Sequence, residues 1–156
     1  MKVSDTPMGV GISMPGGVVG VAVNGAAIYS NAAAPGDSIY DEVATFDRCE
    51  GHPDMKGFYH YHTEPPAITS TDSELIGVMR DGVPVYGIMD MGGVTPVGLD
   101  AEGGHTGVTP DSGGASVYHY HAHLQTEAAP GARTAYFITS GKFKNAFAPG
   151  DCTGCN

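Results

Sequence analysis

Three blocks of this sequence occur twice in the same order, and this internal duplication constrains the fold more than any other feature. The matched ranges, which align without gaps, are 19–30 with 76–87, 46–52 with 99–105, and 59–62 with 118–121. A copy of this size buries too little apolar surface to be stable alone. We therefore expect a single compact domain over residues 1–156, in which repeat 1 (about 19–62) and repeat 2 (about 76–121) pack about a pseudo-twofold axis into one core.

The first block of each copy is typical of a β-hairpin. Asn24-Gly25 and Asp81-Gly82 lie between apolar and β-branched runs, and both dipeptides favour a type I′ turn. The third block reads Tyr-His-Tyr-His in both copies and predicts strands over residues 58–62 and 117–124. A further strand is expected over 134–138, ahead of a C-terminal tail.

The composition agrees with an all-β fold that has little helix. The 156 residues include 24 glycines and 11 prolines, which supply turns and interrupt helices. No stretch shows the 3.6-residue apolar period of a helix over three turns, so we expect no more helix than one turn within residues 72–79.

The charge balance excludes some partners. Seventeen acidic residues face seven Lys and Arg residues, which gives a net charge of −10. Such a chain cannot neutralise a row of phosphates, so we expect no nucleic-acid partner. Residues 6–36 are free of charge, but prolines and glycines interrupt them, so we expect no membrane span. The N-terminus lacks the pattern of a signal peptide, which leaves a cytoplasmic protein and the mature form of an exported one as alternatives.

Six of the seven histidines fall at matched positions of the duplication and are the candidate metal ligands. Two in each copy follow the spacing i, i+2, which places both imidazoles on one face of a strand, and a third lies on the preceding loop. If the two strands lie side by side, they form one shared site or a close pair of sites with a position open for water or substrate. The six are His52, His60, His62, His105, His119 and His121.

Imidazole ligands suit zinc, copper, iron or nickel, and we expect zinc or copper. The alternative is a structural network, in which the histidines and tyrosines of these strands form hydrogen bonds and no ion is bound.

Aspartates also follow the repeat. Asp54 and Asp111 lie between the loop histidine and the strand of their copies, and are our candidates for a general base beside an open metal position. Asp47 and Asp100 precede the loop histidines by five residues, and could accept the second N–H of a metal-bound imidazole. The alternative for all four is turn formation, the commonest role of Asp in Gly/Pro-rich loops.

Three cysteines allow two arrangements. Cys49 can form a disulfide with Cys152 or with Cys155, which leaves one thiol free. Alternatively, the three cysteines and His52 have the composition of a structural Cys₃His zinc site, which would remove that histidine from the set above.

Together the Val-Asn-Gly-x-x-Ile-Tyr block, the Leu-Asp-x-x-x-Gly-His-Thr-Gly stretch at 99–107 and the duplicated Tyr-His-Tyr-His resemble the YHYH domain family of bacterial proteins. The resemblance covers residues 19–138, most of the chain. Members of this largely uncharacterised family commonly look secreted. The resemblance thus implies an exported, secreted or periplasmic protein and favours a disulfide. It implies no reaction.

The residues favour a metal-dependent enzyme, with hydrolysis as the expected reaction. The histidines would hold the ion, a bound water would be the nucleophile, and Asp54 or Asp111 would be the base. Gly-x-Ser-x-Gly, P-loop and His-Glu-x-x-His motifs do not occur. The alternatives are a copper or iron oxidoreductase, a non-enzymatic metal-binding or carrier protein, and an interaction module whose Tyr/His strands build the core.

Overall fold

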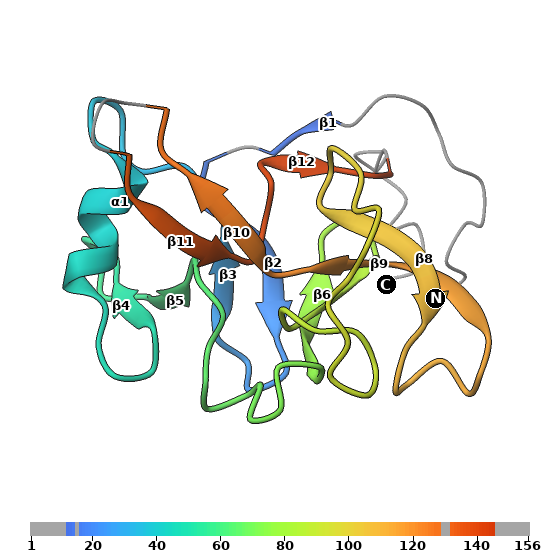
Figure 1. Cartoon of the computed structure of the whole chain (residues 1–156). Coiled ribbons are helices and arrows are strands. Elements are labelled where there is room, and N and C mark those ends of the chain that lie inside the picture. The colour runs from blue at the N-terminus through green and yellow to red at the C-terminus, as the bar shows by residue number, and fades with distance from the viewer. Residues whose placement is uncertain (1–11, 15, 129–131, 146–156) are drawn as a thin grey trace, which may run out of the picture.

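The computed structural model describes residues 12–14, 16–128 and 132–145, and its regular secondary structure is almost all β-strand (Figure 1). The main sheet has eight strands in the order β4-β5-β3-β2-β6-β7-β9-β8. Its strands are β2 (Val18–Ala22), β3 (Ala27–Tyr29), β4 (Gly51–Pro53), β5 (Tyr59–Tyr61), β6 (Leu75–Met79), β7 (Pro84–Tyr86), β8 (Gly104–Val108) and β9 (Ser116–His121). The expected all-β, single-domain fold is confirmed.

Two small two-stranded sheets and one helical segment complete the described structure. The small sheets pair β1 (Ile12–Ser13) with β12 (Lys142–Phe143), and β10 (His123–Thr126) with β11 (Thr134–Phe137). The helical segment is α1 (Ile39–Glu42), which continues into a 3-10 turn at Val43–Thr45. The expectation of a helical turn within 72–79 is wrong, because Leu75–Met79 forms strand β6. Within the described part of the chain, no helix is long and apolar enough to cross a membrane.

The main sheet consists of two four-stranded halves with the same connectivity. In the first half β2 pairs antiparallel with β3, β3 pairs parallel with β5, and β5 pairs antiparallel with β4. Strands β6, β7, β9 and β8 repeat this pattern. The halves meet at the antiparallel pair β2–β6, so β4–β5 and β9–β8 lie at opposite ends of the sheet (Figure 1). The pseudo-twofold axis itself stays a prediction.

The two predicted hairpins are present, but their turn type is not I′. A type I′ turn needs positive φ at both central residues, whereas only the glycines, Gly25 (88°) and Gly82 (83°), have positive φ here. Their amides donate to Ala22 O and Met79 O, which gives a type I turn closed by a left-handed glycine. The Asn or Asp before each glycine instead uses its side-chain oxygen to accept an amide proton two residues on.

The core lies where the middle of the main sheet meets the C-terminal strands. Buried residues of β2, β3, β6 and β7 pack with Ile138, which directly follows β11, and with Phe143 of β12. Tyr61 and Tyr120 of the two Tyr-His-Tyr-His blocks also belong to this core. Their hydroxyls contact the hairpin turns, Tyr61 through Asn24 Nδ2 (2.9 Å) and Tyr120 through Asp81 (2.7 Å to Oδ2). Because side chains alternate along a strand, the neighbouring histidines point to the other face.

Candidate metal centres

The six matched histidines form two separate groups, one at each end of the main sheet. The first centre contains His52, His60 and His62, and the second contains His105, His119, His121 and Asp90. Five inter-strand steps separate β5 from β9, roughly 24 Å along the sheet at about 4.8 Å per step. The expectation that the two YHYH strands lie side by side and form one shared site or a close pair is therefore wrong, because β2 and β6, not β5 and β9, pair at the middle of the sheet.

Strand register brings the three imidazoles of each centre together. His52 on β4 lies directly opposite His60 on β5, and their ring centroids are 4.5 Å apart. In the second half His105 on β8 lies opposite His119 on β9, with centroids 4.8 Å apart. The third imidazole follows two residues later on the same face, as the period of a strand requires.

Every one of the six Nδ1 atoms is held by an oxygen atom, so each ring has a fixed orientation. The contacts are His52 Nδ1 to Thr45 Oγ1 (2.8 Å), His60 to Phe58 O (3.1 Å), His62 to Ser30 O (2.6 Å), His105 to Val97 O (3.1 Å), His119 to Val117 O (3.0 Å) and His121 to Gly87 O (2.7 Å). Five of these oxygens are carbonyls, which can only accept. The Thr45 hydroxyl already donates to Glu42 O, so it too accepts from the imidazole.

With the proton on Nδ1, the Nε2 lone pairs of each centre point at one another. His60 Nε2 and His62 Nε2 are 3.0 Å apart, and the buried Nε2 atoms of His52 and His121 have no hydrogen-bond partner. Lone pairs facing at such a distance repel unless a cation, either a proton or a metal ion, lies between them. A tetrahedral ion with bonds of about 2.05 Å places its ligand atoms about 3.3 Å apart, so the spacing suits a metal.

A carboxylate lies beside each centre, near two imidazoles of the first and all three of the second, and sequence reasoning missed both. In the first centre Glu42 Oε2 lies 3.3 Å from His62 Nε2 and 3.7 Å from His52 Nε2. In the second, Asp90 Oδ1 lies 3.1 Å from the Nε2 of His105, 3.2 Å from that of His121 and 3.7 Å from that of His119. Each carboxylate comes from a segment between the first and second aligned blocks, where the copies differ in length and no pattern marks a ligand.

Burial disfavours the charged form of the buried imidazoles in both centres. Desolvation lowers the pKa of His62 to about 4, and it also lowers the pKa of His60. The same cause lowers the pKa values of His119 and His121 in the second centre. Desolvation raises the pKa of the Glu42 carboxyl. A proton is therefore a poor counter-charge for these lone pairs near neutral pH, and a metal ion is the better one.

Each centre combines fully buried side chains with partly exposed ones. His62, His119 and His121 have side chains no more than 2% exposed. The histidine expected on a loop lies on a strand in both copies, β4 for His52 and β8 for His105. This histidine and the carboxylate are the accessible members, with exposures of 14% for His52 and 25% for Glu42 in the first centre. An ion or a small molecule would reach either centre past these two side chains.

Ion pairs outside the first centre fix the helix that carries Glu42. Ser38 caps α1, and its hydroxyl donates to Glu127 Oε1 at 2.8 Å. Arg133 links the same Glu127 carboxylate (Nε to Oε2, 2.9 Å) to Asp41 of the helix (Nη1 to Oδ1, 2.6 Å). The hairpin β10–β11 thus holds α1 against the end of the sheet (Figure 1).

The predicted bases Asp54 and Asp111 lie outside both centres and are connected to them through tyrosines. Tyr29 stacks on His60 with ring centroids 3.7 Å apart, and its hydroxyl donates to Asp54 Oδ2 (2.9 Å). Tyr86 meets His119 edge-on, and its hydroxyl lies 3.2 Å from Asp111 Oδ2. Asp54 Oδ1 also accepts two amide protons of its own turn, which together with the tyrosine lower the pKa of this carboxyl.

The other predicted polar residues have structural contacts. Asp47 and Asp100 accept the hydroxyls of Tyr59 and Tyr118, on the face away from the imidazoles, together with amides of their own turns. They do not accept imidazole N–H groups, so that expectation is wrong. The seventh histidine, His123, contacts a backbone carbonyl and Gln125 instead of either centre.

The cysteine arrangements depend on residues outside the described ranges. Cys49 has a free thiol, and Cys152 and Cys155 are not among the described residues. His52 groups with the other two imidazoles of its copy, which does not favour the Cys₃His arrangement.

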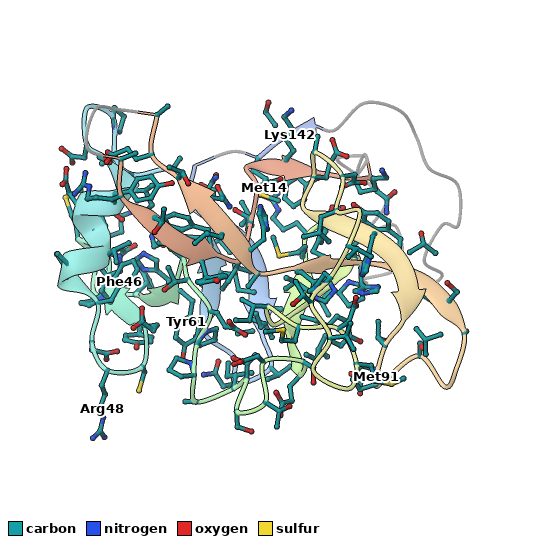
Figure 2. The ribbon with its side chains drawn as sticks, in the orientation of Figure 1. Met14, Phe46, Arg48, Tyr61, Met91 and Lys142 are labelled. Atoms are coloured by element: carbon teal, nitrogen blue, oxygen red, sulfur yellow. The ribbon has the colours of Figure 1, made fainter. Side chains whose placement is uncertain are left out.

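The surroundings of the two centres differ. Phe46, labelled in Figure 2, packs beside the first. Its ring is stacked parallel to that of His62 and edge-on to that of His52. The second centre borders a groove of about 950 Å³, whose lining includes His105, Tyr86 and Asp111.

Comparison with known proteins gives one match. The sequence profile of a family described as "YHYH protein" matches residues 5–95, which include every ligand of the first centre and end just after Asp90. No curated protein and no solved structure matches the chain.

Proposed function

The chain belongs to the YHYH protein family, and from the geometry of its two centres we propose that it binds two transition-metal ions, one at each end of the main sheet. One observation supports this most strongly: in each centre three Nε2 atoms with fixed tautomers lie close together, joined by Asp90 at the second centre and with Glu42 near two of the three imidazoles at the first. Hydrogen-bonding Nδ1 to an oxygen is the usual way in which proteins orient a metal-binding imidazole.

Three imidazoles and one carboxylate are nitrogen and oxygen donors that suit zinc or copper. For zinc, four protein ligands complete a tetrahedral shell, as in sites that bind the ion without catalysis. At the second centre, where four groups converge, such a shell leaves no position for a water nucleophile. Metal binding is the function that the geometry of both centres supports best. A metal that accepts five or six ligands would keep a position on the solvent side of His52 and Glu42, or of His105 and Asp90.

Metal-dependent hydrolysis at the second centre is a second candidate, supported by the groove that His105 and Asp111 both line. A bound ion would act there as a Lewis acid on a substrate carbonyl or phosphoryl oxygen. Asp111 would take the proton of the attacking water, and Tyr86 would orient this carboxylate. If so, D111N protein should keep its metal and lose its activity toward p-nitrophenyl esters or phosphates. Equal activity in D111N and wild-type protein would remove this candidate.

Metal stoichiometry tests the main proposal. The protein is purified without a metal-affinity column, stripped of metal, reloaded with zinc or copper and desalted. Elemental analysis by mass spectrometry should then find two equivalents of the metal per chain. His60→Ala and His119→Ala should each lose one equivalent, and H52A and H105A repeat the test at less buried positions. His123→Ala is the matched control and should keep two. Less than about a tenth of an equivalent in folded, reloaded wild-type protein would refute the proposal.

A further inference from the structure

Two methionines adjoin the second centre, and they distinguish it from the first. Met89 and Met91 flank Asp90 in the sequence. Both residues line a narrow hollow together with Asp90, His119 and His121. Figure 2 shows Met91 at the same end of the molecule as the second centre, on the opposite side from Phe46. Two thioethers therefore adjoin the same hollow as three ligands of the second centre.

The loop after β7 fixes this arrangement through backbone hydrogen bonds. The amide of Met89 donates to Asp72 O at 2.7 Å, and the amide of Asp90 donates to Val94 O at the same distance. Gly92 (φ 85°) and Gly93 (φ 73°) make the intervening turn, which residues with a side chain would strain. The Met-Asp-Met segment is thus held at the base of a tight turn beside the imidazoles.

The first centre presents different chemistry to its ion. Its neighbours are the aromatic rings of Phe46 and Tyr29, and its carboxylate, Glu42, lies between Asp41 and Val43. The groups that lie together there are three imidazoles, with the Glu42 carboxylate beside two of them. Thioether sulfur is a soft donor that selects Cu(I), whereas imidazole and carboxylate groups also bind Zn(II) and Cu(II).

We propose that the second centre is a copper site, in which a thioether from Met89 or Met91 joins the imidazoles to bind Cu(I), while the first centre binds its ion through nitrogen and oxygen alone. This inference rests on the proposed function. It adds a metal preference and two ligand candidates at the second centre. Binding Cu(I) requires no electron transfer, because the ion is supplied reduced.

Competition for Cu(I) against bicinchoninate, under anaerobic conditions, tests the proposal. The variants are Met89→Leu, Met91→Leu and the double variant, in which leucine keeps the apolar volume and removes the sulfur. The double variant should lower the Cu(I) affinity of the second centre by about tenfold or more. Zn(II) stoichiometry should stay at two in all variants. M55L, at a fully exposed methionine on the β4–β5 turn, is the matched control and should not change the Cu(I) affinity.

X-ray absorption at the copper edge gives a second readout that does not depend on affinity. Copper added at one equivalent to H52A protein, whose first centre is disabled, should show a sulfur neighbour, and the sulfur signal should disappear when both methionines are leucine. A nitrogen- and oxygen-only copper shell in H52A, together with unchanged Cu(I) affinity in the double variant, would overturn the proposal and leave two-ion binding intact. Absence of both zinc and copper binding would refute this proposal and the proposed function together.

Discussion

Disabling one centre should remove half of the thermal stabilisation that metal ions give this protein. His52→Ala and His105→Ala each remove one of three imidazoles at the more exposed edge of a centre, where the fold tolerates truncation better than at the buried pair. Each centre takes its imidazoles from its own half of the sheet, so the two centres share no histidine. At roughly 24 Å apart on the strand count, the two effects should add with little interaction.

The magnitude follows from binding linkage. An ion at about 100 times its dissociation constant stabilises the folded state by about 2.7 kcal/mol per centre. For a domain of this length, 1 kcal/mol corresponds to about 2–4 °C in Tm, so each centre should contribute about 5–11 °C. Wild-type protein should therefore gain about twice the shift of either single variant.

Scanning calorimetry in buffered free zinc, with a chelator control, measures these shifts. The variant that combines His52→Ala with His105→Ala should show almost no shift in Tm, and H123A should behave as wild type. If either single variant abolished the whole shift, the centres would be one cooperative unit and the separation argued from the strand order would be wrong. An equal shift in wild-type and double-variant protein would place the stabilising ion elsewhere.

Three further predictions concern residues around the centres. Arg133→Ala releases α1 and should weaken zinc binding at the first centre by about tenfold while sparing the second, as calorimetric titration of H105A and H52A backgrounds would show. Thr45→Val removes the acceptor of the His52 N–H and should lower the zinc affinity of the first centre by about 10–100-fold, whereas Thr45→Ser should keep the wild-type affinity. Equal zinc affinities in T45V and wild-type protein would refute the argument that this hydrogen bond fixes the tautomer. Burial raises the pKa of Asp81, so ionisation of this carboxyl lowers the free energy of unfolding as pH rises above the unfolded pKa of about 3.8. Asp81→Asn, which installs the residue that the first copy has at this turn, should therefore gain stability over wild type as pH increases from 3 to 7 in urea titrations, and a gain independent of pH would contradict this cause.

Strand periodicity is what made the histidine groups predictable from the sequence. The i, i+2 spacing places His60 and His62 on one face of their strand, independently of the rest of the fold. His52 joins them because it lies on β4, which pairs with β5 in register. The hairpins were equally local, although the turn type was wrong, since only the glycine adopts positive φ.

The carboxylate ligands and the number of centres depend on long-range arrangement. Glu42 lies on a helix of four residues, which is too short for any periodic signal. Asp90 lies in a loop that is positioned by the hydrogen bond from the amide of its neighbour Met89 to Asp72 O. Whether the two YHYH strands meet depends on which strands pair at the middle of the sheet, and local sequence does not encode that choice.

The grouping of ligands within each half has a consequence for biosynthesis. All described ligands of the first centre lie between residues 42 and 62, and Ser30, which orients His62, precedes them. A growing chain therefore has a complete ligand set for one ion once residue 62 has left the ribosome, long before Ile138 and Phe143 are available to close the core. An ion captured at that stage would order the first half early, and the second half would then add to an existing sheet edge at β2.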